Sequence, residues 1–185
     1  MKSDQERWNK RYRMQPFRTN VEPIVQEYYK KAGGNKALDI ACGQGRNSVF
    51  LAKNGFLVDA VDLSDYALAQ IPKHPNITII HSDLDNYLLP SNSYDLILNI
   101  NYLNRNFFHQ IKEALKPEGL VIFESFIIAH GDFDNPKNPQ YLLRKNELLH
   151  AFLSMEILYY REFIEQNLRG EKTYVASLVA RKNFS

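Results

Sequence analysis

The stretch LDIACGQGRNSVFLA, residues 38–52, decides which fold this chain adopts. An apolar run carries Asp39, the turn that follows contains Gly43 and Gly45, and a helical pattern begins at Arg46. A buried strand that passes through a glycine turn into a helix is the first unit of an open α/β sheet. Such sheets bind ligands beyond the carboxyl ends of their strands, where small residues let the backbone approach a ligand. The stretch therefore predicts a strand, a binding loop and a helix.

Beyond this stretch, short apolar runs alternate with helical patterns. Strands are predicted at 36–41, 56–62, 76–82, 94–100 and 120–126. Helices are predicted between them, and this alternation is typical of a mostly parallel sheet covered by helices. Two further β-rich runs, 155–164 and 172–182, are joined only by EQNLRGE. Because so short a connection excludes a crossover helix, the last strand is predicted to run antiparallel.

Length, composition and charge limit the classes to which the chain can belong. With 185 residues it is long enough for one compact domain, so one site is expected. A composition with 44% hydrophobic and 24% charged residues excludes disordered and collagen-like classes. The formal net charge of +2 supplies no basic field that would gather nucleic acid or an anionic membrane.

Apolar runs and cysteine content bear on the compartment. No apolar run approaches the roughly 20 residues that span a bilayer, and the N-terminus is polar where a signal peptide would be apolar. The single cysteine, Cys42, excludes an intrachain disulfide and a cysteine-based metal site. We therefore expect a cytoplasmic protein with no membrane partner and no metal.

The first 35 residues are predicted to form a helical cap on the α/β domain, which is predicted to cover residues 36–185 and to form one compact unit with the cap. Within the cap, Trp8 and Tyr12 are four residues apart and so share one face of a helix. That face either packs against the domain or closes over a ligand.

A carboxylate marks the end of the second predicted strand. Asp62 stands seventeen residues after Gly45, where it can accept hydrogen bonds from both hydroxyls of a ribose. Together with the glycine loop it indicates a ligand of adenosine type. The alternative is a tight turn followed by a surface acid that caps a helix beginning near Ser64. The dinucleotide fingerprint requires glycine where Ser48 stands, which disfavours an NAD-dependent oxidoreductase but leaves it as an alternative.

The run DIACGQG (39–45) resembles the acidic-x-Gly-x-Gly-x-Gly motif of the class I S-adenosylmethionine-dependent methyltransferases, with Ala41 in place of the first glycine. The longer run ACGQGRNSVFLAKNGFLVDAVDLS (41–64) is similar to the tellurite-resistance branch of that superfamily. The resemblance implies a Rossmann-like three-layer sandwich whose seven strands have the order 3-2-1-4-5-7-6. It also implies methyl transfer from S-adenosylmethionine to a small-molecule or metalloid oxyanion acceptor, with S-adenosylhomocysteine as product.

The same resemblance assigns roles to individual residues. The cofactor would contact Asp39, Ala41, Gly43, Gly45, Arg46, Asn47, Asp62, Leu63, Asp83, Leu84 and Asn99, with Trp8 and Tyr12 as a cap. The glycine loop would line its methionine end, Asp62 its ribose and Asp83 its adenine amino group. Two assignments have simpler alternatives: Arg46 as an exposed helix start and Asp83 as an Asx turn.

The acceptor is assigned to residues just past the fourth predicted strand, at the end of the fifth and in the loop after it, namely Tyr102, Arg105, Glu124 and His130. Glu124, His130 and His109 are the candidates for a general base, but no catalytic residue is assigned, because methyl transfer mainly needs alignment. A non-catalytic cofactor-binding domain remains an alternative. Nucleic acid is not expected, since residues 99–102 lack both prolines of the Asn-Pro-Pro-Tyr motif that receives a flipped base. The oligomeric state is not predicted.

Overall fold

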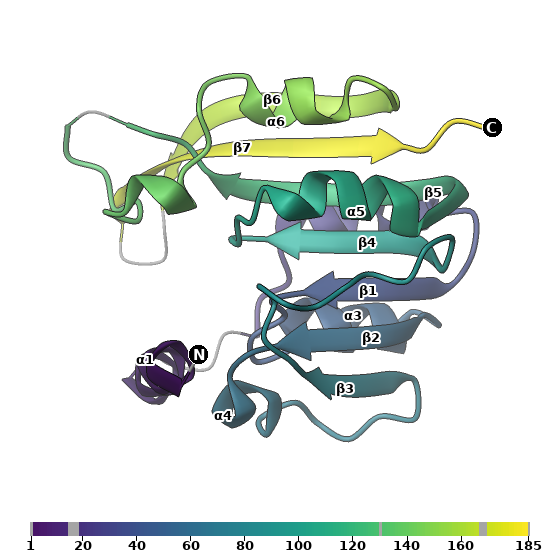
Figure 1. The fold of residues 1–185 in the computed structure, drawn as a ribbon, viewed down its shortest axis with the longest axis horizontal. Coiled ribbons are helices and arrows are strands. Elements are labelled where there is room, and N and C mark those ends of the chain that lie inside the picture. The colour runs from purple at the N-terminus through teal and green to yellow at the C-terminus, as the bar shows by residue number, and fades with distance from the viewer. Residues whose placement is uncertain (1, 15–18, 130, 167–169, 185) are drawn as a thin grey trace.

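The computed structural model describes residues 2–14, 19–129, 131–166 and 170–184, and a seven-stranded sheet lies at its centre. The strands are β1 (Lys36–Ile40), β2 (Leu57–Asp62), β3 (Ile77–His81), β4 (Tyr94–Ile100), β5 (Leu115–Phe126), β6 (Glu156–Gln166) and β7 (Lys172–Arg181). Their order across the sheet is β3-β2-β1-β4-β5-β7-β6 (Figure 1). β1 pairs in parallel with β2 and β4, whereas β7 runs antiparallel to β5 and β6. The expected strand order and the antiparallel last strand are confirmed.

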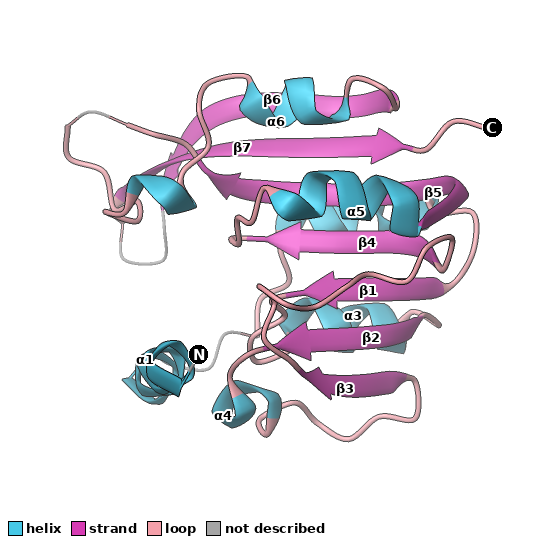
Figure 2. Ribbon diagram, viewed as in Figure 1, coloured by secondary structure: helices cyan, strands magenta, loops and turns pink. Residues whose placement is uncertain are grey.

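Helices cover both faces of this sheet and make three layers (Figure 2). The helices are α1 (Lys2–Met14), α2 (Pro23–Tyr28), η1 (Tyr29–Lys31), α3 (Arg46–Lys53), α4 (Asp65–Leu68), α5 (Asn106–Ala114), η2 (Pro139–Tyr141) and α6 (Glu147–Phe152). α2, η1 and α3 share one hydrophobic core with the sheet, and α5 and α6 share the other. α1 packs against α4. Within the described ranges, no helix is long and apolar enough to cross a membrane.

The central strands are buried almost throughout because helices cover both of their faces. Along β1, Leu38 and Ile40 contact the core that contains α5 and α6, while Ala37 contacts the core that contains α2 and α3. The same alternation in β4 explains why its sequence is apolar apart from Asp95 and Asn99. Each fully buried leucine or isoleucine contributes roughly 1.5–3 kcal/mol to stability.

This topology has a switch point between β1 and β4, where an open α/β sheet is expected to form a ligand crevice. α3 follows β1 and covers one face of the sheet, whereas α5 follows β4 and covers the other. The two connections therefore leave in opposite directions at the carboxyl ends of neighbouring strands, which is where open α/β sheets bind ligands. In Figure 1 the arrowheads of β1 to β4 all point to the side on which α1 lies.

β5 begins at Leu115, five residues before the strand predicted at 120–126. The sequence Pro117-Glu118-Gly119 predicted a turn between helix and strand. In the structure Glu118 has a φ of 63°, its N–H donates to the Lys182 carbonyl at 3.1 Å, and the Lys182 N–H donates to the Gly119 carbonyl at 2.9 Å. The three residues are therefore an irregular part of β5, and their backbone hydrogen bonds go to Lys182, just after the end of β7. The local sequence does not indicate this partner.

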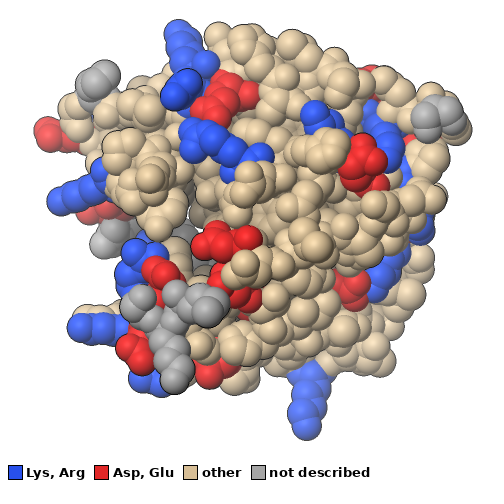
Figure 3. All heavy atoms as spheres, in the orientation of Figure 1, with Lys and Arg blue, Asp and Glu red and all other residues tan. Residues whose placement is uncertain are grey.

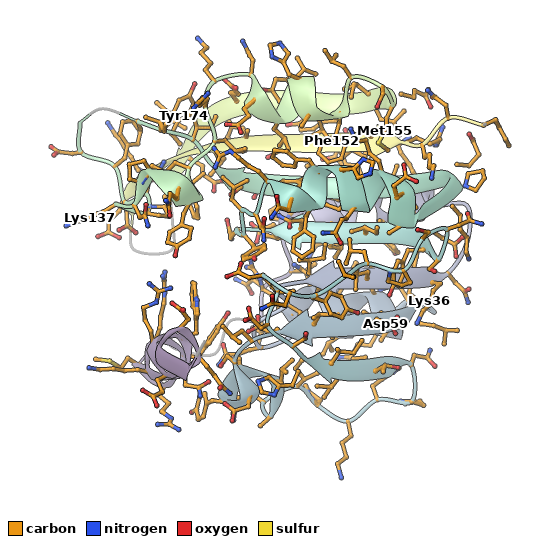
Figure 4. All side chains as sticks on the ribbon, in the orientation of Figure 1. Lys36, Asp59, Lys137, Phe152, Met155 and Tyr174 are labelled. Atoms are coloured by element: carbon orange, nitrogen blue, oxygen red, sulfur yellow. The ribbon has the colours of Figure 1, made fainter. Side chains whose placement is uncertain are left out.

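A polar network lies near the amino ends of the strands, away from the crevice. The side chains of Lys36 and Asp59 point toward one another and form an ion pair (Figure 4). The Tyr94 hydroxyl donates to Asp59 Oδ2 at 3.0 Å. Because these polar groups pair with one another, we infer that they stabilise the fold and do not bind a ligand.

Candidate functional site

The loop between β1 and α3 turns through left-handed backbone. The φ angles of Ala41, Gly43 and Gly45 are 54°, 56° and 74°. An alanine in this region costs about 1 kcal/mol relative to glycine, so Ala41 is a mildly strained position. At Gly43 a Cβ atom would lie 2.6 Å from the Tyr12 hydroxyl, so this position needs glycine for its backbone and for the close approach of α1.

Asp62 connects the loops that follow β1 and β2. Its side chain is buried; Oδ2 accepts from the Gly43 N–H and Oδ1 accepts from the Ser64 N–H, both at 2.8 Å. Burial raises the pKa of this carboxyl. The cap of α4 is Ser64, whose hydroxyl accepts from the Ala67 N–H at 3.1 Å. Asp62 is thus not the surface helix cap of the alternative interpretation.

Asp39, at the end of β1, is a second buried carboxylate, with 2% of its surface exposed. The Ser48 hydroxyl donates to its Oδ2 at 2.6 Å. Burial raises its pKa to about 6, and the negative charge of Asp62 adds to the rise. Two desolvated carboxylates at one edge of the sheet favour a ligand that brings a positive charge and hydrogen-bond donors.

The loops after β3 and β4 bring further acidic groups toward the crevice. Asp83 accepts from the Asp85 N–H and from Asn86 Nδ2, both at 3.1 Å, which is the geometry of an Asx turn. Burial raises the pKa of Tyr102 to about 12, and the charges of Asp85, Asp83 and Asp62 contribute. Tyr102, assigned from sequence to the acceptor, therefore lies among the carboxylates assigned to the cofactor.

The remaining residues of the expected adenine pocket differ in exposure. Leu84 is buried and joins the core that contains α5 and α6. Leu63, next to Asp62, is half-buried, and its carbonyl oxygen lies 2.9 Å from the His81 ring nitrogen Nε2. The two leucines therefore lie on the loops that follow β2 and β3, one half-buried and one in the core.

Asn99, at the end of β4, carries an unsatisfied hydrogen-bond acceptor. Its side chain is fully buried and its Nδ2 donates to the Tyr102 carbonyl at 2.7 Å. In the part of the chain that the structure describes, Asn99 Oδ1 is the only buried side-chain nitrogen or oxygen without a hydrogen-bond partner. Such an atom beside a ligand crevice indicates a donor on the ligand.

Arg46 and Asn47, at the start of α3, contact the segment that leads into α2. Arg46 forms an ion pair with Glu22, and its Nη1 donates to the Asn20 carbonyl at 3.2 Å. The Glu22 N–H donates to Asn47 Oδ1 at 3.1 Å. The two side chains thus join α2 to α3. The positive charge of Arg46 also offsets part of the rise that burial causes in the pKa of Asp39.

α1 lies at the mouth of the site. The Tyr12 hydroxyl contacts Gly43, and the rings of Trp8 and Tyr12 have centroids 6.1 Å apart. The Arg11 guanidinium lies 5.1 Å from the Trp8 ring centroid, and a hydrogen bond to Tyr141 raises the pKa of Arg7. α1 therefore reaches from the glycine loop to η2. Figure 3 shows a hollow on this side of the molecule, with acidic side chains at its rim.

Of the residues assigned to the acceptor, Arg105 is engaged within the protein. Its guanidinium donates to both carboxylate oxygens of Glu147, at 2.6 and 3.0 Å. It also donates to the carbonyls of Gln140 and Leu142, at 3.1 and 2.9 Å. Arg105 thus fastens η2 and α6 to the start of α5. His130 lies outside the described residues.

Glu124, near the end of β5, is buried, and the Ser177 hydroxyl donates to it. Burial raises its pKa to about 7, and the charges of Glu22 and Glu165 add to the rise. Burial therefore favours the protonated form of this carboxyl. Among the described residues, no three His, Cys, Asp or Glu side chains are grouped to hold a metal ion.

Three residues that matter for this geometry had no local signal in the sequence. In the sequence, Ser48 is notable only because it replaces the third glycine of the dinucleotide fingerprint, yet its hydroxyl donates to Asp39. Asn9 binds the start of α4, and Tyr141 meets Arg7 across the mouth of the site. Each pairs with a residue on another element, and such pairing is invisible to periodicity or spacing.

The raised pKa of Glu124 predicts how stability depends on pH. A carboxyl whose folded pKa is about 7, above its ordinary 4.5, makes the native state bind more protons than the unfolded chain between those values. Stability from this group is therefore highest at low pH and falls as the pH rises through 7. We expect Glu124→Gln to raise the Tm at pH 8 by about 2–4 °C and to leave it nearly unchanged at pH 4.5. Thermal melts at both pH values measure this, and an equal shift at both would contradict it.

Comparison with known proteins finds similarity to methyltransferases. The family described as "Methyltransferase domain" matches residues 37–119. A protein of Geobacillus sp. (strain WCH70) named as a methyltransferase is 36% identical over 109 residues, which cover 52% of this chain and 44% of that protein. "Probable S-adenosyl-L-methionine-dependent methyltransferase TehB" of Haemophilus influenzae (strain ATCC 51907 / DSM 11121 / KW20 / Rd) is 27% identical over 164 residues, covering 80% of this chain and 57% of TehB. The chain thus spans about half the length of these relatives.

The crystal structure of TehB from Haemophilus influenzae is similar to this fold, with a TM-score of 0.74 at 22% identity. The match covers 97% of this chain and 67% of the TehB chain. The similarity therefore includes the seven-stranded sheet and extends over nearly all of the elements described above.

Proposed function

We propose that this chain is a class I S-adenosylmethionine-dependent methyltransferase similar to TehB. It would bind S-adenosylmethionine in the crevice between β1 and β4 and methylate a small-molecule acceptor. The observation that carries this proposal is the pair of buried carboxylates, Asp39 and Asp62, at the carboxyl ends of adjacent strands. A carboxylate held in low dielectric binds an ammonium or a pair of hydroxyls strongly, because water no longer competes. The cofactor offers both groups.

Other features of the crevice fit this cofactor. Gly43 lets the loop and the Tyr12 hydroxyl approach each other closely, and Asn99 Oδ1 is a buried acceptor without a partner, which a donor on the cofactor would satisfy. We assign the methionine end to Asp39, Ala41, Gly43 and Gly45, with Arg46 and Asn47 at the start of α3. We assign the ribose to Asp62, the adenine to Leu63, Asp83 and Leu84, and the region of the sulfonium to Asn99. The charges around Tyr102 favour a place for it beside the cofactor as well.

When bound, the cofactor would supply an electrophilic methyl group for the acceptor, and S-adenosylhomocysteine would remain as the product. The protein has to align these groups and exclude water, and such positioning can lower a barrier by roughly 7–11 kcal/mol. If the acceptor must lose a proton, Glu124 is suited to accept it, because burial holds its pKa at about 7.

We propose that residues 1–35 serve as a cap whose helix α1 closes over the bound cofactor. Tyr12 already contacts the glycine loop, and Trp8 packs beside it. An aromatic pair at this place would exclude water from the sulfonium.

For the acceptor we propose a metalloid oxyanion. The resemblance of residues 41–64 to the tellurite-resistance branch supports this class. Arg11 supports it too, since it lies on α1 next to Trp8 at the mouth of the site and can attract an anion, whereas Arg7 is paired with Asp4. Arg105 contributes indirectly, by holding η2 in position opposite α1.

Calorimetry on the purified chain tests the cofactor assignment. We expect S-adenosylmethionine and S-adenosylhomocysteine to bind, because both carry the ammonium and the ribose that Asp39 and Asp62 would hold. We expect no heat from NAD, because Ser48 stands where the dinucleotide fingerprint needs glycine. Binding of NAD alone would reject the proposal.

The acceptor class is tested on the same protein by the formation of S-adenosylhomocysteine. The assay compares tellurite and selenite with small thiols and amines. Turnover of an oxyanion supports the proposed class, whereas turnover of thiols or amines alone rejects the oxyanion and keeps the methyltransferase. Cofactor binding without turnover of any acceptor would favour a non-catalytic domain.

A further inference from the structure

α1 is held on the molecule by polar contacts more than by apolar burial. Its sequence, KSDQERWNKRYRM, contains few large apolar residues, and one of them, Met14, is 76% exposed. An isolated helix of this length is only marginally stable in water. Its docked position therefore depends on a few specific contacts with the rest of the chain.

Asn9 makes the most extensive of these contacts. Its Nδ2 donates to Asp65 Oδ1 at 2.7 Å, and its Oδ1 accepts from the Ser64 hydroxyl at 2.6 Å. The Tyr66 N–H lies 3.4 Å from the same Oδ1. Ser64 is fully buried, so one amide side chain of α1 binds the first turn of α4 on both its donor and its acceptor side.

These contacts connect α1 to Asp62 by two routes. Asn9 binds Ser64, whose N–H donates to Asp62 Oδ1. Tyr12, three residues after Asn9 and so on the same face of the helix, contacts Gly43, whose N–H donates to Asp62 Oδ2. The carboxylate proposed to bind ribose is thus the common partner of the two loops on which α1 rests.

We propose that Asn9 is a positioning residue, a latch that holds α1 closed over the cofactor site through the first turn of α4. This inference rests on the proposed function, since closure affects binding only if the cofactor occupies the crevice. A cofactor that contacts α1 binds the closed state better than the open state. Weakening the latch therefore lowers its apparent affinity by the factor by which closure becomes less populated.

The latch can be observed without any ligand, because Trp8 is the only tryptophan of the chain and lies next to Asn9 on α1. We expect Asn9→Ala to leave the thermal melt of the domain nearly unchanged and to make Trp8 fluorescence about twice as sensitive to acrylamide. Amide hydrogens of residues 2–14 should exchange faster. Lys10→Ala, at an exposed position of the same helix, is the matched control and should behave as the wild type.

The effect on binding is measured by stopped-flow fluorescence with S-adenosylhomocysteine. We expect its dissociation rate from Asn9→Ala to rise about tenfold, which is the loss of roughly one net hydrogen bond. The association rate should change less, because an open cap does not hinder entry.

A double substitution distinguishes the latch from a general loss of structure. Asn9→Asp sets two carboxylates against each other and should release α1 as Asn9→Ala does. Adding Asp65→Asn returns an amide to the pair and should restore both the Trp8 signal and the dissociation rate. Asp65→Asn alone keeps an oxygen for the Asn9 amide and should remain close to the wild type.

The outcomes separate the latch from the proposed function. If quenching and exchange of α1 are the same in Asn9→Ala and the wild type, or if the double substitution fails to restore them, the latch is overturned. If the wild type binds no S-adenosylhomocysteine, the proposed function fails, while the ligand-free measurements still report whether Asn9 holds α1.

Discussion

Replacement of Asp62 by alanine is expected to weaken S-adenosylhomocysteine binding by at least about 100-fold, because the ribose loses two hydrogen bonds to a charged acceptor. The side chain is buried, so water cannot replace it within the closed site. The loss also removes the acceptor for the N–H groups of Gly43 and Ser64, which loosens both loops. Calorimetry gives the affinity.

Two further variants distinguish the loss of ribose contacts from a general loss of structure. Asp62→Asn keeps one acceptor oxygen, and we expect its affinity to fall between those of the wild type and Asp62→Ala. Glu113→Ala removes an exposed carboxylate near the end of α5 and should leave binding unchanged. If Asp62→Ala melts normally and binds within about threefold of the wild type, the ribose assignment is wrong.

Replacement of Asp39 by asparagine is expected to change binding and stability in opposite directions. The cofactor ammonium would lose its carboxylate, and we expect the Kd for S-adenosylmethionine to rise about 30-fold. The free protein should become more stable above pH 6, since the substitution removes a buried charge and keeps an oxygen for the Ser48 hydroxyl. Function at this position thus costs stability.

The sign of the stability change follows from the pKa. Asp39 has a folded pKa of about 6, above its ordinary 3.8, so its contribution to stability declines as the pH rises from about 4 through 6. Melts of Asp39→Asn should therefore exceed those of the wild type at pH 8 and approach them at pH 4.

Glu124→Gln is the matched control for Asp39→Asn. It also removes a buried carboxylate and should give a similar gain in Tm at pH 8. It should keep the affinity for S-adenosylmethionine, because Glu124 lies on β5 rather than beside the glycine loop. If both variants lose the cofactor equally, Asp39 has no special place in the site.

The sequence by itself determined the elements whose signals are local. β1, β2 and β4 follow from apolar runs that end at turns, and the start of α3 follows from the glycines before it. Parallel strands bring their carboxyl ends to one edge of the sheet. Asp39 and Asp62 could therefore be assigned to one site before the fold was known. The strand order came from the resemblance to a family, because spacing alone does not distinguish the possible orders.

Only the tertiary structure decided which partners the remaining side chains have. Arg46 pairs with Glu22 and Arg105 with Glu147, and the sequence indicated neither of these partners. The same holds for Asn9, whose partner Ser64 lies on a different element. These contacts join residues distant in sequence. They carry no periodicity, because they depend on how finished elements pack against each other rather than on the order of neighbouring residues.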